Sequence, residues 1–258
     1  MSLRADPDSG NQPLPSGAGR LAEKSAQEFA AGDLVKAQEL AGDSALAAAY
    51  THLQQIVGVM AVLLPFVLFF GNWALTGNEL ESSISAYYHT PMGDVFVGVL
   101  WALAVFFLSY NYRPLPGFNL DNKLSTLASV AAVCVAVFPT TSDASVATRS
   151  EQNIGIVHMV SAGVLFTLLA VFALFLFPRS GGAMTPEKRR RNVLYRTCGA
   201  IMAAAILLMF PSQLAPDSWH AFLGLETISV LAFGISWLVK GGFLGILVDR
   251  KPVSRRGP

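Results

Sequence analysis

The sequence predicts an all-α fold, a polytopic membrane helical bundle of six transmembrane helices with both termini in the cytoplasm. Three observations predict it. The 258 residues are 53% hydrophobic and only 14% charged, whereas soluble domains carry about 25% charged residues. The hydrophobic residues gather in six runs that approach or reach the ~17–25 residues a helix needs to cross a bilayer. The Lys and Arg residues fall on alternate sides of these runs, as in multi-pass membrane proteins.

Residues 1–50 precede the first apolar run and are predicted to form a polar cytoplasmic extension. The first 20 are rich in Pro, Gly, Ser and Asp, which is typical of a disordered segment. From Leu21 to Tyr50 the composition shifts to Ala, Leu, Glu, Lys and Gln, with Gly32-Asp33 and Gly42-Asp43 interrupting the run. We expect one or two short amphipathic helices there, in the cytoplasm or on the membrane surface.

The six predicted spans share a long apolar run with few or no charges. They cover about His52–Leu75, Gly93–Tyr110, Leu124–Phe138, Ile154–Phe177, Tyr195–Phe210 and Trp219–Val239. The second, third and fifth are close to the minimum length, so the count depends also on the charges of the loops. Together the spans predict a transmembrane domain over 51–248, followed by a basic cytoplasmic tail over 249–258.

The positive charges set the predicted orientation. Lys and Arg occur in the segments that would face the cytoplasm, 1–50, 111–123, 178–196 and 240–258. The intervening segments 71–91 and 211–218 have none, and 139–153 has only Arg149. Because cytoplasmic loops carry an excess of Lys and Arg, this alternation predicts an even number of spans in a plasma or inner membrane, with membrane lipids as partners.

Three of the four histidines, His89, His158 and His220, fall at predicted extracytoplasmic helix ends. The topology therefore places them at one depth. Three neutral imidazoles suit zinc, leaving a fourth coordination position for water, and zinc lowers the pKa of that water so that hydroxide forms. The sequence thus predicts zinc as the candidate cofactor. The alternative is that each histidine is an interfacial residue at a helix end.

Three further polar residues accompany the histidines. Ser85 lies four residues before His89, so on a helix the two share a face. Asp94 and Glu226 lie deeper, where an ionisable residue usually faces the bundle interior. We expect Ser85 or Asp94 to orient the ligands or the water, and Glu226 to act as an acid or base. The alternatives are a helix cap for Ser85, a helix-dipole contact for Asp94 and a structural hydrogen bond for Glu226.

Two stretches carry a resemblance to known families. The segment 83–98, Ser-Ile-Ser-Ala-Tyr-Tyr-His-Thr-Pro-Met-Gly-Asp-Val-Phe-Val-Gly, and the later Phe-Pro-Thr-Thr of 138–141 resemble a family of uncharacterised bacterial six-helix membrane proteins, loosely similar to the DRAM-like families. That resemblance covers roughly 52–245 and implies a helical bundle without an activity.

The pair Ser85-x-x-x-His89 is also similar to the early helix of the membrane hydrolases that include alkaline ceramidases and the progestin and adipoQ receptors. This resemblance implies a zinc hydrolase, with Asp94 as a loose match to the family's aspartate. The family's His-x-x-x-His pair in the last helix is absent here, so His220 and His158 would supply the other ligands.

Three functions remain open at this level. The first is a metal-dependent hydrolase acting on a lipid or amide at an extracytoplasmic-side site. The second is a transporter or solute-binding membrane protein in which Glu226 and Asp94 line the pathway. The third is a non-catalytic membrane scaffold. A nucleic-acid partner is not predicted, because the basic residues are dispersed among the loops.

Overall fold

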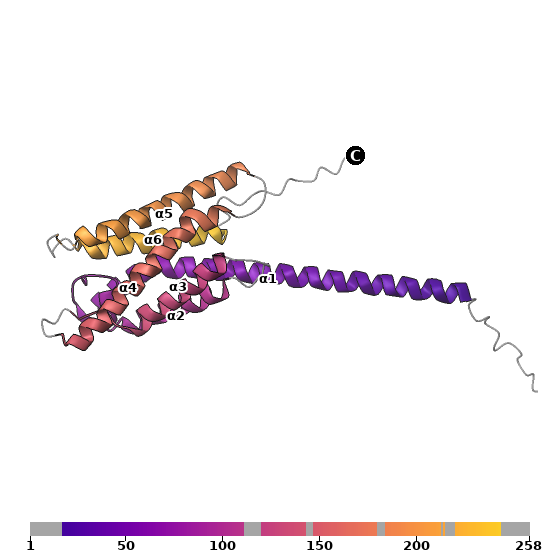
Figure 1. Ribbon diagram of the computed structural model, residues 1–258. Coiled ribbons are helices and arrows are strands. Elements are labelled where there is room, and N and C mark those ends of the chain that lie inside the picture. Colours follow the sequence, from indigo (N-terminus) through magenta and orange to yellow (C-terminus); the bar gives the residue numbers. More distant parts are fainter. Residues whose placement is uncertain are drawn as a thin grey trace, which may run out of the picture. The chain divides into compact units, whose positions relative to one another are not determined.

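The computed structural model describes residues 17–110, 120–142, 147–179, 184–212, 214 and 220–243, with side chains described from Lys36 onward except at residue 37. Within these ranges every regular element is helical (Figure 1). The predicted all-α fold is therefore confirmed. The chain divides into two compact units, residues 1–49 and 50–258.

Helix α1 runs without a break from Gly17 to Thr76 and belongs to both units. The prediction of one or two short helices over Leu21–Tyr50, with breaks at the glycines of 32 and 42, was therefore wrong. The reason lies in the composition: Ala, Leu, Glu, Lys and Gln favour a helix, and a glycine in a helix costs only about 1 kcal/mol relative to alanine. Disorder was predicted over residues 1–20. Residues 17–20 instead form the first turn of α1, and residues 1–16 lie outside the described ranges.

The second unit is a bundle of helices with short connections. After α1 come α2 (Gly93–Ser109), α3 (Leu120–Val137), α4 (Arg149–Val171), α5 (Pro186–Ser212) and α6 (Ala221–Lys240). A short 3₁₀ helix η1 (Ser85–His89) precedes α2, and α4 continues into a π-helical turn, η2 (Phe172–Leu176), and a 3₁₀ turn, η3 (Phe177–Arg179). Consecutive helices run in opposite directions, with α2 beside α3 and α5 beside α6 (Figure 1).

Five helical segments of the described chain are long and apolar enough to cross a membrane, as in a multi-pass membrane protein. They are Gln38–Thr76, Leu120–Val137, Arg149–Arg179, Pro186–Ser212 and Ala221–Lys240. The remaining apolar helix, α2, has 17 residues, or about 26 Å at 1.5 Å per residue, against a hydrocarbon core of about 30 Å. Trp219 and the predicted basic tail lie outside the described residues.

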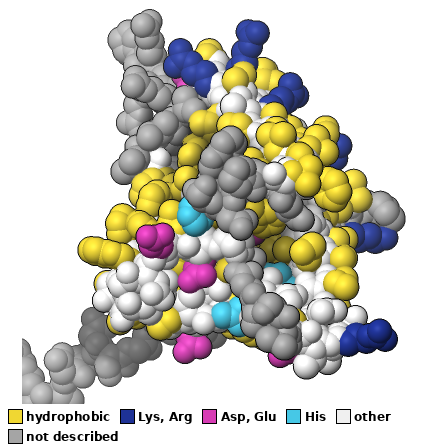
Figure 2. Space-filling model, turned by 90° about the vertical axis from the view of Figure 1, so that its left-hand side faces the viewer, with side chains coloured by type: hydrophobic (Ala, Val, Ile, Leu, Met, Phe, Trp, Pro, Cys, Tyr) yellow, Lys and Arg dark blue, Asp and Glu magenta, His cyan; other side chains and the backbone are white. Residues whose placement is uncertain are grey.

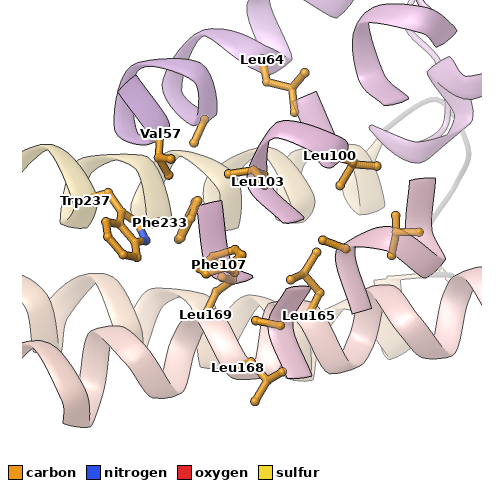
Figure 3. Close-up of a cluster of buried hydrophobic side chains, with 14 of the residues drawn as sticks. Val57, Leu64, Leu100, Leu103, Phe107, Leu165, Leu168, Leu169, Phe233 and Trp237 are labelled. Atoms are coloured by element: carbon orange, nitrogen blue, oxygen red, sulfur yellow. The ribbon is translucent and has the colours of Figure 1, made fainter. Parts of the chain in front are cut away.

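The core of the bundle is formed by apolar side chains that α1, α2, α4 and α6 direct toward one another (Figure 3). Trp237 is fully buried and makes edge contacts with Phe106, Phe177 and Phe233. Two buried serines of α3 bond to α2: Ser125 donates its hydroxyl hydrogen to the Phe107 carbonyl, and Ser129 donates to the Ala104 carbonyl at 2.7 Å.

Glycine allows α1 and α6 to approach closely. A Cβ added at Gly234 of α6 would lie 2.9 Å from the Gly58 carbonyl oxygen and 2.9 Å from the Val62 amide nitrogen of α1. Both atoms belong to the backbone, so no side-chain rotation relieves the overlap. Small residues at helix contacts of this kind are typical of membrane bundles, where packing contributes much of the association energy.

Candidate functional site

The second unit contains a cavity of about 70 Å³ between its helices. Its walls come from α1, α2, α3, α4, α6 and η1, and most are the apolar side chains of the core in Figure 3, among them Leu64, Leu100, Leu103, Leu165 and Phe233. Three polar residues lie on the same walls: Ser85 of η1, His158 of α4 and Glu226 of α6. All three were singled out from the sequence, in segments far apart along the chain.

Glu226 lies in the second turn of α6 and is only 5% exposed. Its Oε2 accepts a hydrogen bond of 2.5 Å from the Ile84 backbone N–H, and the amide and hydroxyl of Ser85 also donate to this carboxylate. Ile84 is the residue that begins η1. Because the first amides of a helix have no partner within the helix, the carboxylate of α6 satisfies them and holds η1 against the bundle.

His158 is 2% exposed and lies against the backbone carbonyls of Phe138 and Val135. Its Nδ1 lies 2.6 Å from the Phe138 carbonyl oxygen. A carbonyl only accepts, so Nδ1 carries the proton, and in the neutral ring Nε2 is then an acceptor. Nε2 is buried and has no hydrogen-bond partner among the described residues. Leaving a buried acceptor unpaired costs about 1–3 kcal/mol of stability. A hydrogen-bond donor bound in the cavity would therefore be stabilised by this nitrogen.

A glycine brings His158 to this position. A Cβ at Gly155 would lie 2.9 Å from the Thr141 backbone nitrogen and closer still to its hydroxyl. Glycine therefore lets the first turns of α4 pack directly on the segment that follows α3. His158 lies one turn further along α4, at the level of the Phe138 carbonyl.

The other predicted site residues lie elsewhere. His89 is exposed, with Nε2 2.7 Å from the Thr140 carbonyl oxygen, although it is near enough to act electrostatically on His158. Asp94 is exposed in the first turn of α2. His220 begins α6 in a left-handed conformation with φ 44°. None of these three is among the residues that line the cavity.

Figure 2 views the bundle from the end at which η1 and the first turn of α6 lie. Acidic and histidine side chains gather on this face, and the Lys and Arg side chains are found along its margins. This agrees with the predicted depth of the histidines, since sequence position along a helix fixes depth. Although the three histidines lie at this end, their ring nitrogens do not meet at a common point.

The three histidines do not fit a zinc site as they are arranged. Among the residues that the structure describes, no three His, Cys, Asp or Glu side chains lie close enough together to hold a metal ion. A catalytic zinc site needs three protein ligands. No step of a mechanism is therefore derived through a metal.

Asn72 is a buried polar residue that the sequence analysis did not single out. Asn72 of α1 is 1% exposed, and both atoms of its side-chain amide lack a hydrogen-bond partner within the described chain. It does not line the cavity. The signal was present, because an amide inside a predicted span is expected to face the bundle interior.

Comparison of the chain with family models, with curated proteins and with solved structures finds no match. Both family resemblances therefore remain predictions.

Removal of divalent metals is expected to leave the thermal unfolding midpoint of the purified protein unchanged, because its histidines are not arranged as metal ligands. The midpoint would be measured in mild detergent with and without a chelator, beside the His89→Ala variant. Loss of a hydrogen bond to an exposed histidine is expected to cost less than about 1 kcal/mol. A midpoint that falls with chelator and returns with added zinc would contradict this arrangement.

Proposed function

We propose that this chain is a six-span protein of the plasma or inner membrane that binds a small, largely apolar molecule carrying a hydrogen-bond donor. The observation that carries the proposal is the Nε2 atom of His158, a buried acceptor without a partner on the wall of an apolar cavity. This corresponds to the solute-binding alternative of the sequence analysis. Among the described residues, the hydrolase alternative lacks the three grouped ligands that it requires.

The chemistry of the cavity sets the class of ligand. His158 offers an acceptor, and Glu226, already accepting from η1, adds a carboxylate. The remaining wall is hydrocarbon. Each Å² of apolar ligand surface that moves from water into contact with it contributes about 25 cal/mol to binding. An alcohol with an aliphatic chain meets both demands: its hydroxyl donates to Nε2, and its chain contacts Leu100 and Leu165.

The size of the cavity limits how much of the ligand it can enclose. Its volume is about 70 Å³, roughly half that of the ~150 Å³ engineered cavity that takes up benzene. A compact alcohol, or the polar end of a longer one, is the size expected. The rest of a longer molecule would extend between the helices.

Two features support six spans with both termini in the cytoplasm. Helix α2 runs antiparallel to α3 beside it (Figure 1), and its 17 residues reach the lower limit of about 17 for a spanning helix. The charges of the loops alternate as the orientation requires. If α2 crosses, the chain returns to its starting side after α6.

Filling the cavity is expected to remove the ligand. Ala162 lines the cavity, so Ala162→Leu would occupy it and would keep both polar residues, His158 and Glu226. Ala102 is exposed on α2, so Ala102→Leu adds the same atoms outside the cavity and serves as the matched control. Protein would be purified in mild detergent, and the small molecules released on denaturation would be measured by mass spectrometry.

The expected result is one hydroxylated or otherwise donor-bearing apolar compound, near one per chain, in the wild type and in Ala102→Leu and lost from Ala162→Leu. The same compounds at the same level in all three proteins would mean that none of them binds in the cavity. The binding proposal would then be rejected, and the scaffold alternative would remain.

A further inference from the structure

Cations gather inside the bundle at the end opposite η1. Lys240 is the last residue of α6, and Lys188 and Arg191 lie in the first two turns of α5. Lys240 is within electrostatic reach of both of them and of one carboxylate, Asp121 in the first turn of α3. Among these four groups, three cations face one anion.

These three cations are less exposed to solvent than charged residues on a protein surface usually are. Lys188 is only 7% exposed, and Arg191 and Lys240 are half-buried. The Nζ of Lys240 lies 5.4 Å from the centre of the Phe177 ring, a cation–π contact that holds the ammonium group against the protein. The neighbouring Arg189 and Arg190 on the same helix are exposed. The basic run of α5 therefore has an inner and an outer set.

The depth of the cluster matches a lipid headgroup. Lys240 ends the apolar segment of α6, and Phe177 lies near the end of the apolar segment that continues from α4. Both segments are long enough to span the membrane, so their ends lie at the level of the phosphates. An anionic headgroup at that level would meet these three cations.

We propose that Lys188, Arg191 and Lys240 bind the phosphate of an anionic membrane phospholipid between α5 and α6. A phosphate provides several acceptor oxygens for these donors, and charge-assisted hydrogen bonds of this kind are stronger than neutral ones. Basic pockets between transmembrane helices on the cytoplasmic side are suited to such headgroups. This site is separate from the cavity at His158 and does not depend on it.

The test compares two variants that each lose two positive charges from the same region. The Arg191→Gln, Lys240→Gln double variant changes the inner set, and the Arg189→Gln, Arg190→Gln double variant changes the outer set. Full-length protein in detergent would be stripped of lipid and titrated with phosphatidylglycerol, and separately with phosphatidylcholine and with glycerol phosphate. Binding would be followed by native mass spectrometry and by the thermal midpoint.

We expect the wild type and the outer-set variant to bind phosphatidylglycerol with similar affinity, and the inner-set variant to bind it at least roughly tenfold more weakly. Arg191→Lys with Lys240→Arg keeps the charges and is expected to retain binding, which separates loss of charge from loss of folding. Equal weakening of the two double variants would overturn the proposal. So would phosphatidylcholine binding as tightly, or glycerol phosphate alone giving the full effect.

Discussion

Replacing Glu226 by leucine is expected to lower the free energy of unfolding by about 2–4 kcal/mol, because at least two main-chain amides lose their acceptor. The Ile84 amide is bound by this carboxylate at 2.5 Å, and the amide of Ser85 also donates to it. Leucine fills a similar volume and accepts nothing. The loss would be measured from the thermal midpoint of purified protein in detergent.

Glu226→Gln is the matched control, since its side-chain carbonyl still accepts from the amides. It is expected to retain most of the stability that leucine loses. Hydrogen exchange should localise the effect: peptides covering 77–92 exchange faster in Glu226→Leu, whereas those of the α2–α3 contact change less. Uniformly faster exchange along the chain would show that Glu226 acts in general packing and does not hold η1.

Gly234→Ala is expected to destabilise the bundle by about 1–3 kcal/mol, as overpacking of a closely packed contact does. The added methyl would meet backbone atoms of Gly58 and Val62 at 2.9 Å, so α1 and α6 must separate. The larger Gly234→Leu is expected to prevent recovery of folded protein.

Gly224→Ala, on the same helix, is the control for Gly234→Ala. A Cβ there meets nothing within 4 Å, so the change is expected to be neutral or slightly stabilising through helix propensity. Both proteins would be compared by thermal midpoint and by the fraction that remains monodisperse after heating. Equal midpoints for the two alanine variants would show that α1 and α6 do not meet at Gly234.

Most of the fold was predictable because apolar runs report directly on helices in a membrane. The second predicted span, Gly93–Tyr110, corresponds to the apolar helix Gly93–Ser109, and the sixth, predicted to end at Val239, corresponds to a helix that ends at Lys240. The continuity of α1 was not predicted. Two glycine–aspartate pairs suggested breaks, but helix propensity across many residues outweighs such local signals.

The sequence predicted the height of each candidate site residue along its helix. It did not predict which way the side chain faces. Sequence position places a residue at a height along its helix, and the rotation of that helix about its axis decides what the residue faces. Ser85, His158 and Glu226 have rotations that bring them to one cavity, whereas Asp94 is exposed. Tertiary packing sets these rotations, and the Gly155–Thr141 contact that positions His158 joins segments separated by a loop.

The hydroxyls of Ser125 and Ser129 also bear on how the chain enters the membrane during synthesis. Helix α2 is short for a spanning segment, and α3 is the least apolar of the five long segments. Alone, α2 barely reaches across the hydrocarbon core, and α3 gains less from lipid than the other long segments do. Because the α3 serines donate to α2 carbonyls, the two helices satisfy each other's polar groups when they insert as one hairpin. If α2 crosses the membrane as proposed, we expect α2 and α3 to insert together, with the contact between them making up for the short length of α2.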